Sequence, residues 1–356
     1  MQFAAKYPRI LERFERFWQG AETDRPVLFI SAPREDPDRS VPKPAWEKPE
    51  DRVLPENMVA VARWRLARTT YLAEGYPHYF ANYGPGILHG CIGGEADFTA
   101  PDTVWFPQYL RDIEEFTSLR FLPEGKWWSL IRASTQAVLE ELGDEIVVSF
   151  TDIGGAADII ASAVGTEQLL FDCVERPEAV KAAVEHCHKL WMEAYELNHS
   201  YLRPHQDVTT PWWPVISPGR TYMTQCDFNA MISPQLFADL FAGELGAVWK
   251  AMDHACYHLD GIGTEPHVPA LLGQGNLKCV QWVPAPGTSA LLHAPMLRRI
   301  QEAGVNITFG LNPEELEPAI RAFDPRRLMV SIDCESVAEA KTLIEEAKRW
   351  TADRKV

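Results

Sequence analysis

The nine residues from Asp253 to Gly261 read Asp-His-Ala-Cys-Tyr-His-Leu-Asp-Gly. Side chains alternate between the two faces of a β-strand, so one face of this stretch carries only groups that bind metals or transfer protons. They are His254, Cys256, His258 and Asp260. The other face is apolar and packs, and Gly261 marks the point where a buried strand opens into a loop. In a parallel barrel, His258 and Asp260 would then lie at the C-terminal mouth, where barrel enzymes place their active sites.

Similar short apolar runs recur along the chain, with longer amphipathic stretches between them, as in alternating strands and crossover helices. The eight predicted strands cover residues 27–31, 79–83, 146–151, 207–213, 256–260, 277–283, 305–310 and 328–333. From residue 256 onward the spacing leaves room for one strand, one helix and two loops in each unit. The sequence therefore predicts an α/β fold with a single (β/α)8 TIM barrel over residues 1–356, N-terminal helices included.

Helix signals and loops complete this prediction. Ser233-Pro234 precedes a predicted helix over 235–252, and Asn312-Pro313 opens another. The last helix is expected over 337–350, from its apolar helical spacing. Segments 32–55 and 84–123, rich in Pro, Asp and Trp, are expected to be loop insertions at the mouth. A doubly wound sheet is the alternative, but no glycine-rich phosphate loop favours it.

The composition limits the functional classes. The chain has 356 residues, of which 46% are hydrophobic, and can bury a large core. Its formal net charge of −16 argues against nucleic acid and anionic membranes as partners. The N-terminus lacks a signal peptide, and no apolar run approaches the roughly 20 residues that span a bilayer. We expect a cytoplasmic protein with a small-molecule substrate. The odd number of seven cysteines does not suggest a disulfide framework.

Four stretches resemble the uroporphyrinogen decarboxylase superfamily, which also contains zinc-dependent methyltransferases that move methyl groups to or from corrinoid proteins. They are Asp227-Phe-Asn-Ala-Met-Ile-Ser-Pro234, Tyr257-His-Leu-Asp-Gly261, Gln281-Trp-Val-Pro284 and Ser331-Ile-Asp-Cys334. The resemblance implies a TIM barrel. True decarboxylases hold porphyrin carboxylates with an arginine-rich segment after the first strand, where this chain has only Arg34. The methyltransferase branch is therefore favoured.

That branch binds zinc through a His-x-Cys motif at the fifth strand and a second cysteine after the last strand. Here the resemblance implies His258 and Cys334 as ligands, with Asp260 in place of the first family cysteine. A second register, His254-Ala255-Cys256 with Cys334, restores the ligand types but lies nearer the middle of the strand. Cys226 is a further candidate ligand. The cobalamin would sit on a separate corrinoid protein, and related barrels often pair as homodimers.

Other residues at predicted strand ends are candidates for binding substrate. They are Asn82, Tyr83, Trp212, Trp213, Gln281 and Trp282. Tryptophans at a barrel mouth line a pocket for a planar ligand or pack under a loop, and both interpretations stay open. Likewise, His258 with Asp260 is either a metal or proton-transfer site or a hydrogen-bonded polar pair. Cys256, Cys279 and His254 are expected to be structural.

Three functions are compatible with these patterns. The first is a zinc-dependent methyltransferase working with a corrinoid protein. The second is a metal-free lyase on a carboxylated substrate, in which Asp152 or Asp260 transfers the proton. The third is a non-catalytic barrel that binds a small ligand. This hypothesis stays open because Asp260 replaces a cysteine of the family's zinc site.

Overall fold

The structure is a computed structural model that describes residues 2–100 and 103–354. Its strands are β1 (Val27–Pro33), β2 (Thr69–Ala73), β3 (His78–Tyr79), β4 (Val147–Val148), β5 (Thr221–Gln225), β6 (His254–Asp260), β7 (Leu277–Val283), β8 (Asn306–Gly310) and β9 (Leu328–Asp333). Seven of them form one sheet in the order β2-β1-β9-β8-β7-β6-β5, and β3 pairs with β4 in a second sheet. All pairs are parallel except β1 with β2. This is an α/β fold with a mostly parallel sheet, consistent with a TIM-like barrel.

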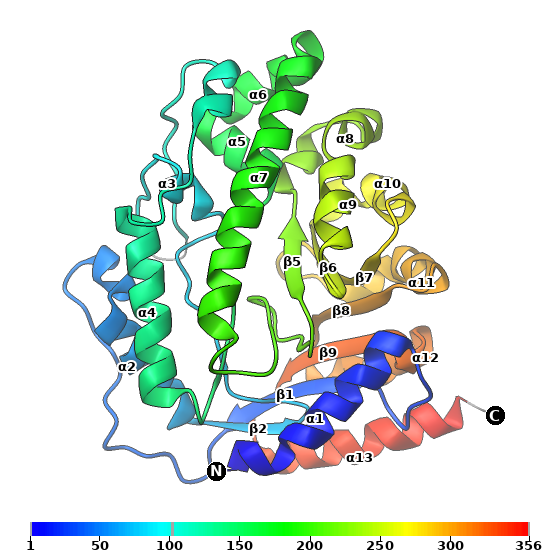
Figure 1. Ribbon diagram of the computed structural model, residues 1–356. Coiled ribbons are helices and arrows are strands. Elements are labelled where there is room, and N and C mark those ends of the chain that lie inside the picture. The colour runs from blue at the N-terminus through cyan, green and yellow to red at the C-terminus, as the bar shows by residue number, and fades with distance from the viewer. Residues whose placement is uncertain (1, 101–102, 355–356) are drawn as a thin grey trace.

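Helices connect and cover the strands (Figure 1). The α-helices are α1 (Gln2–Gln19), α2 (Pro55–Leu66), α3 (Leu88–Cys91), α4 (Lys126–Leu142), α5 (Ala156–Val164), α6 (Thr166–Glu175), α7 (Pro177–Leu202), α8 (Pro234–Leu240), α9 (Ala242–Lys250), α10 (Val268–Gly273), α11 (Ala294–Glu302), α12 (Leu316–Ala322) and α13 (Val337–Asp353). Short 3₁₀ turns are η1 (Pro49–Val53), η2 (Ile113–Ser118), η3 (Asp227–Met231), η4 (Ile262–His267), η5 (Ala290–His293), η6 (Pro313–Glu315) and η7 (Pro325–Arg327). None of these helices is long and apolar enough to cross a membrane.

Most predicted strands are present, but one prediction is wrong. Residues 207–213 do not form a strand; Thr209 makes only an isolated bridge with Ser217, and the strand of this region is β5. Pro211 removes a backbone donor within the 207–213 stretch, and Pro214 removes another directly after it, which explains why a Val-Thr-Thr run does not extend into a strand. Strand β2, antiparallel to β1, was not predicted. The helix expected over 235–252 is split into α8 and α9 at Phe241.

Two apolar clusters flank the large sheet. The inner cluster includes Phe29, Met223, Cys256 and Cys279, and it receives Phe14, Phe17 and Trp18 from α1. The outer cluster includes Ala255, Tyr257 and Leu259, which pack under the helices. The alternation predicted for β6 is therefore confirmed: His254, Cys256, His258 and Asp260 lie on the inner face. The 84–123 insertion, apart from 101–102, lies toward the end to which β5 points (Figure 1).

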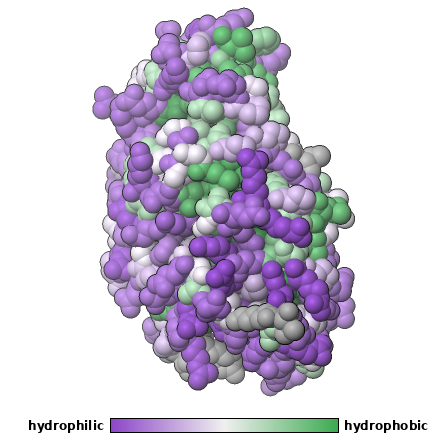
Figure 2. Space-filling model, turned by 90° about the vertical axis from the view of Figure 1, so that its right-hand side faces the viewer, coloured by the Kyte–Doolittle hydropathy of each residue, from purple (hydrophilic) through white to green (hydrophobic). Residues whose placement is uncertain are grey.

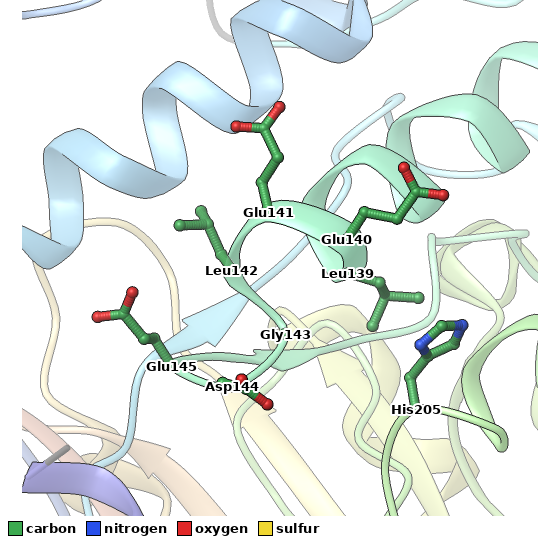
Figure 3. A pocket seen from close by; sticks show the side chains of 8 residues that line it. All are labelled: Leu139, Glu140, Glu141, Leu142, Gly143, Asp144, Glu145 and His205. Atoms are coloured by element: carbon green, nitrogen blue, oxygen red, sulfur yellow. The ribbon is translucent and has the colours of Figure 1, made fainter.

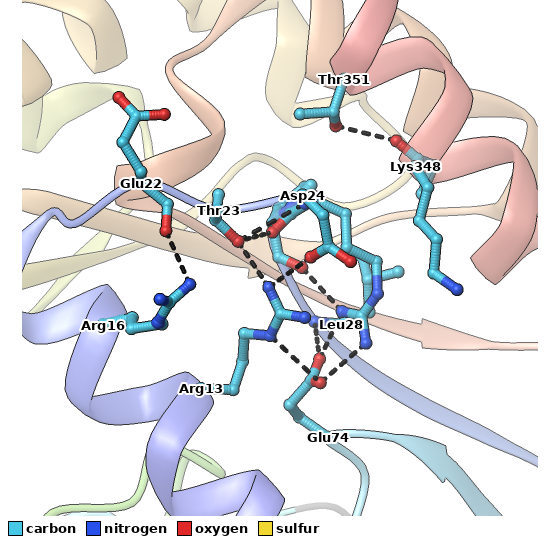
Figure 4. A network of polar contacts seen from close by, with 12 residues as sticks. Arg13, Arg16, Glu22, Thr23, Asp24, Leu28, Glu74, Lys348 and Thr351 are labelled. Carbon is cyan, nitrogen blue, oxygen red and sulfur yellow. Dashed lines mark hydrogen bonds and ion pairs between the residues drawn. The ribbon is translucent and has the colours of Figure 1, made fainter.

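The two ends of the inner face differ. At the amino ends of the strands, here called the floor, Arg25 makes two hydrogen bonds to Glu74, at 2.6 and 2.7 Å. Glu74 also accepts from the backbone N–H of Leu28, and Arg13 lies 3.6 Å away (Figure 4). This buried network connects α1 to the antiparallel strands β1 and β2. The carboxyl ends of the strands are called the mouth.

The outer surface is largely polar. On the face that carries α8, α10 and α11, hydrophilic side chains surround apolar ones gathered near its middle (Figure 2). Such a surface agrees with the excess of acidic over basic residues, 50 against 34.

Candidate functional site

Three potential metal ligands meet at the mouth, on two neighbouring strands. His258 and Asp260 come from the end of β6, and Asp227 opens η3 directly after β5. One ligand atom of each lies within 4.8 Å of the others, and the two aspartates are exposed while His258 is half-buried. Parallel strands bring their carboxyl ends to one edge, which is why residues 31 to 33 positions apart converge here. The group offers one imidazole nitrogen and two carboxylate oxygens.

Gln281 orients the His258 ring. Gln281 lies in register with His258 on β7, is 2% exposed, and places its Oε1 2.7 Å from His258 Nδ1. An amide oxygen only accepts, so this partner assigns the proton to Nδ1. The unprotonated Nε2 then faces Asp260, whose Oδ2 lies 3.9 Å away. A ring nitrogen fixed in this way is the arrangement found in metal-binding histidines.

Asp227 is positioned by a second aspartate behind it. Asp158, in the first turn of α5, accepts the backbone N–H groups of Asp227 at 3.2 Å and of Phe228 at 2.8 Å. Burial, with the neighbouring Asp227 charge, raises the pKa of Asp158 well above its usual value. Gly155 allows this close approach, because a Cβ there would lie 2.0 Å from the carbonyl oxygen of Gln225.

Asp152 lies deeper, beside the same group. It is 6% exposed, and its Oδ1 accepts the backbone N–H of Gly154 at 2.8 Å. Burial, together with the charge of Asp227, raises the pKa of Asp152 to about 7. A carboxyl group with such a pKa can hold or release a proton near neutrality.

The two predicted cysteine ligands are not part of this group. Cys226 is 3% exposed and packs in the outer cluster, where burial raises the pKa of its thiol strongly. Cys334 is 4% exposed and also belongs to the outer cluster; burial raises the pKa of its thiol to about 11. Among the described residues, the structure brings together Asp227, His258 and Asp260.

The second register falls at the floor. His254 Nδ1 lies 2.7 Å from the Ser217 hydroxyl, and its ring stacks on Trp18 with centroids 4.5 Å apart. Cys256 is fully buried in the inner cluster. These contacts give His254 a packing role at the end opposite to the mouth.

The residues predicted to bind substrate separate into two sets. Trp212 packs edge-on against His258, with ring centroids 5.0 Å apart, and Trp213 donates from Nε1 to Thr308 Oγ1 at 2.9 Å. With Gln281, these two tryptophans belong to the inner face.

The other three predicted residues make contacts that fix a turn or the packed core. They are Asn82, Tyr83 and Trp282. Asn82 caps a turn by accepting the N–H of Gly84, and the buried Tyr83 hydroxyl bonds Ser134 and the Leu130 carbonyl. Trp282 is 1% exposed in the outer cluster, beside His293.

Asp227 begins one of the four stretches that resemble the family, but no role was predicted for it from the sequence. The signal was present, because Asp227 lies two residues after Gln225, the last residue of a strand next to β6. Placing the fourth strand over 207–213 separated Asp227 from the predicted strand end and hid this relation.

Comparisons with known proteins bear on the fold. No protein-family model matches the chain, and no curated protein matches it. Among solved structures, the chain is similar to a methyltransferase from Methanosarcina mazei, with a TM-score of 0.64 and 10% sequence identity. The similarity covers 96% of this chain and 98% of the other. At this identity the likeness concerns the fold.

Proposed function

We propose that this chain is a methyltransferase whose reaction takes place at the mouth, at a divalent metal, zinc in the first instance, held by Asp227, His258 and Asp260. The observation that carries the proposal is the convergence of these three ligands with His258 fixed through Gln281. The full-length structural similarity to a methyltransferase supports the reaction class. On this proposal the two sheets act as one (β/α)8 barrel of the uroporphyrinogen decarboxylase type.

The donor set fits a metal with an open position. Three protein ligands and one free site are typical of catalytic zinc. With no thiolate in the group, the centre is harder than the family's His-Cys-Cys set, and oxygen-preferring ions compete better. Bound there, the metal would act as a Lewis acid that activates a thiol or polarises the methyl donor.

The protein residues around the group have separate tasks. Gln281 keeps the His258 proton on Nδ1, and Asp158 holds the Asp227 backbone in place. Trp212 covers one side of His258 and limits access of water there. Asp152 holds a proton within the buried layer beside Asp227.

The methyl-carrying partner on this proposal is a separate corrinoid protein, docked over the mouth. Two large apolar side chains are exposed on the loops after β5 and β7: Met231 at 51% and Leu292 at 69%. Both follow the carboxyl ends of their strands, so a partner docked over the mouth would meet these side chains.

Metal content is the decisive measurement. Wild-type protein, reconstituted with zinc and dialysed, should retain about one zinc per chain by elemental mass spectrometry. Asp227→Asn and His258→Ala should each lose it, whereas Cys334→Ser should retain it. Failure of the wild type to retain zinc would reject the proposal, and loss of zinc in Cys334→Ser alone would return the site to the thiolate set.

A second candidate, a metal-free lyase, is favoured by one observation. Asp152 is buried with a pKa of about 7, suited to protonating a carbanion after carbon dioxide departs. Release of carbon dioxide from a carboxylated substrate in the presence of a chelator, abolished by Asp152→Asn, would support this candidate over the first.

A further inference from the structure

A cavity of about 610 Å³ lies along β2, between the ends of α2 and α4. We propose that it is a second binding site, for a small organic anion that carries a carboxylate or a phosphate group. Arg34 is the main anchor, and Thr70 is a second polar residue of the wall. This proposal is independent of the function proposed for the mouth, because none of Asp227, His258 and Asp260 lines the cavity.

The cavity lies at the edge of the large sheet. Strand β2 is the last strand of that sheet, and the wall continues into Gly75 and Pro77 of the link between β2 and β3. Apolar walls come from Val41, Leu66 and Leu142. A volume of this size is ordinary for a small-molecule site, and the mixture of apolar walls with a few polar groups is typical of one.

Arg34 is an exposed cation of the cavity wall whose charge acts on the wall residue Asp38 without forming a close ion pair. It lines the cavity directly after β1, and its side chain makes one long hydrogen bond, 3.3 Å, to the Leu66 carbonyl. No carboxylate lies within ion-pair distance of it among residues 2–100 and 103–354. An arginine without a close ion pair beside a cavity can donate to an anionic ligand, which would share its charge with Asp38.

Arg68 supplies an independent observation. Its Nη2 donates to the carbonyl of Val41, a wall residue, at 3.0 Å, and its guanidinium lies over the Trp64 ring. Its Nη1 is buried and has no hydrogen-bond partner in the described part of the chain. A buried guanidinium N–H without an acceptor is costly. Arg68 does not line the cavity itself, but it lies between the wall residues Ala67 and Thr69, so an unused donor adjoins the wall. Hydrogen bonds from Ser40 lower the pKa of Asp38, another wall residue, and the charges of Arg68 and Arg34 lower it further.

The charges also give the cavity a direction. Arg34 lies at the end marked by Thr69, which is in register with Pro33. The opposite end, near Pro77, carries Glu145 and leads to an adjoining acidic pocket around the end of α4 (Figure 3). There Glu141 extends toward α2, where it pairs with Arg63. Arg34 therefore attracts an anionic group to its end of the cavity, against the opposing charge of Asp38 there, while Glu145 repels the group from the other end. This arrangement favours a ligand with its negative charge at one end.

The test is isothermal titration calorimetry of the full chain with inorganic phosphate and, separately, with succinate, at constant ionic strength. Saturable binding of at least one anion is expected. Arg34→Gln should weaken it by about tenfold or more, as for a lost charge-assisted hydrogen bond. The matched control Arg39→Gln removes an exposed arginine that does not line the cavity, and should leave binding unchanged.

Preference for phosphate or for succinate identifies the anionic group of the ligand, and either supports the site. Thr70→Val, which removes a wall hydroxyl while keeping the side-chain volume, should weaken binding by a smaller factor. Binding of neither anion, or equal weakening in Arg34→Gln and Arg39→Gln, would overturn the proposal. Unchanged far-ultraviolet circular dichroism in each variant excludes unfolding as the cause.

Discussion

The floor and the mouth of the inner face are built from the same strands but treat charge in opposite ways. At the floor, the buried Arg25 meets Glu74 in two hydrogen bonds, and His254 is held by Ser217 and Trp18. At the mouth, Asp227 and Asp260 approach each other beside His258, and neither forms an ion pair with a lysine or arginine among the described residues. Grouped carboxylates without cations destabilise a fold, so their presence at one end indicates a function there rather than a contribution to stability.

The largest effect is expected when the Arg25–Glu74 contact at the floor is removed. Glu74→Ala leaves Arg25, which is 6% exposed, as an uncompensated buried charge. We expect a loss of about 3–5 kcal/mol in the free energy of unfolding, measured by urea denaturation. The control Glu185→Ala removes an exposed pair with Lys189 and should cost less than about 1 kcal/mol. Equal losses in the two variants would show that the floor network is no more stabilising than a surface pair.

The next effect concerns the pH dependence that Asp152 gives the mouth. Its pKa is about 7 in the folded chain against a usual 3.8, so between these values the folded state holds a proton that the unfolded state has released. Stability therefore falls as pH rises from about 4 to about 7, by at most about 4 kcal/mol at 1.36 kcal/mol per pKa unit.

Asp152→Asn isolates this contribution, because the amide oxygen still accepts the Gly154 N–H. Relative to wild type, the variant should gain stability steadily between pH 4.5 and pH 7.5 in urea denaturation. A difference between the two proteins that stays constant over this range would show that Asp152 titrates normally.

A smaller effect tests how the mouth is ordered. Gln281→Leu removes the acceptor at His258 Nδ1 and should weaken zinc binding about 10–100-fold, measured by competition with a chelating dye. Gln225→Leu is the matched control, since Gln225 flanks His258 in register on the other side and makes no hydrogen bond to it. Gln281→Glu keeps an acceptor and should restore affinity. Equal weakening in both leucine variants would assign the effect to packing.

Much of the fold was accessible from sequence because strand periodicity reports burial directly. Strands β7 and β9 have the predicted bounds, and the inner face of β6 was read correctly from alternation alone. The fourth strand was misplaced because the β-branched residues of 207–213 favour a strand, and the effect of Pro211 within the same stretch was given too little weight. Short strands such as β3, with two residues, depend on neighbouring chain and leave almost no local signal.

The site was only partly accessible for a related reason. Gln281 and Trp282 are adjacent, so they lie on opposite faces, and alternation alone could have excluded Trp282 from the mouth. Cys334 was predicted from the resemblance and Cys226 from its position in the chain, but the burial of both depends on helices packed from elsewhere in the chain. Asp227 required knowing which strands are neighbours, which is a property of the sheet order and not of any local motif.

The two adjacent tryptophans of the mouth differ in whether their indole N–H has a hydrogen-bond partner, and this difference gives the smallest predicted effect. Trp213 is bonded like a floor residue, through Thr308, whereas Trp212 Nε1 is buried without a hydrogen-bond partner in the described chain, beside His258. Trp213→Phe should cost about 1 kcal/mol in unfolding free energy for the lost hydrogen bond and leave zinc affinity unchanged. Trp212→Phe removes an unsatisfied donor, so it should cost less stability than Trp213→Phe while altering ligand binding at the mouth. If Trp212→Phe were the more destabilising of the two, Trp212 would be a packing residue. The contact beside His258 would then stabilise the fold, as the contacts of the floor do.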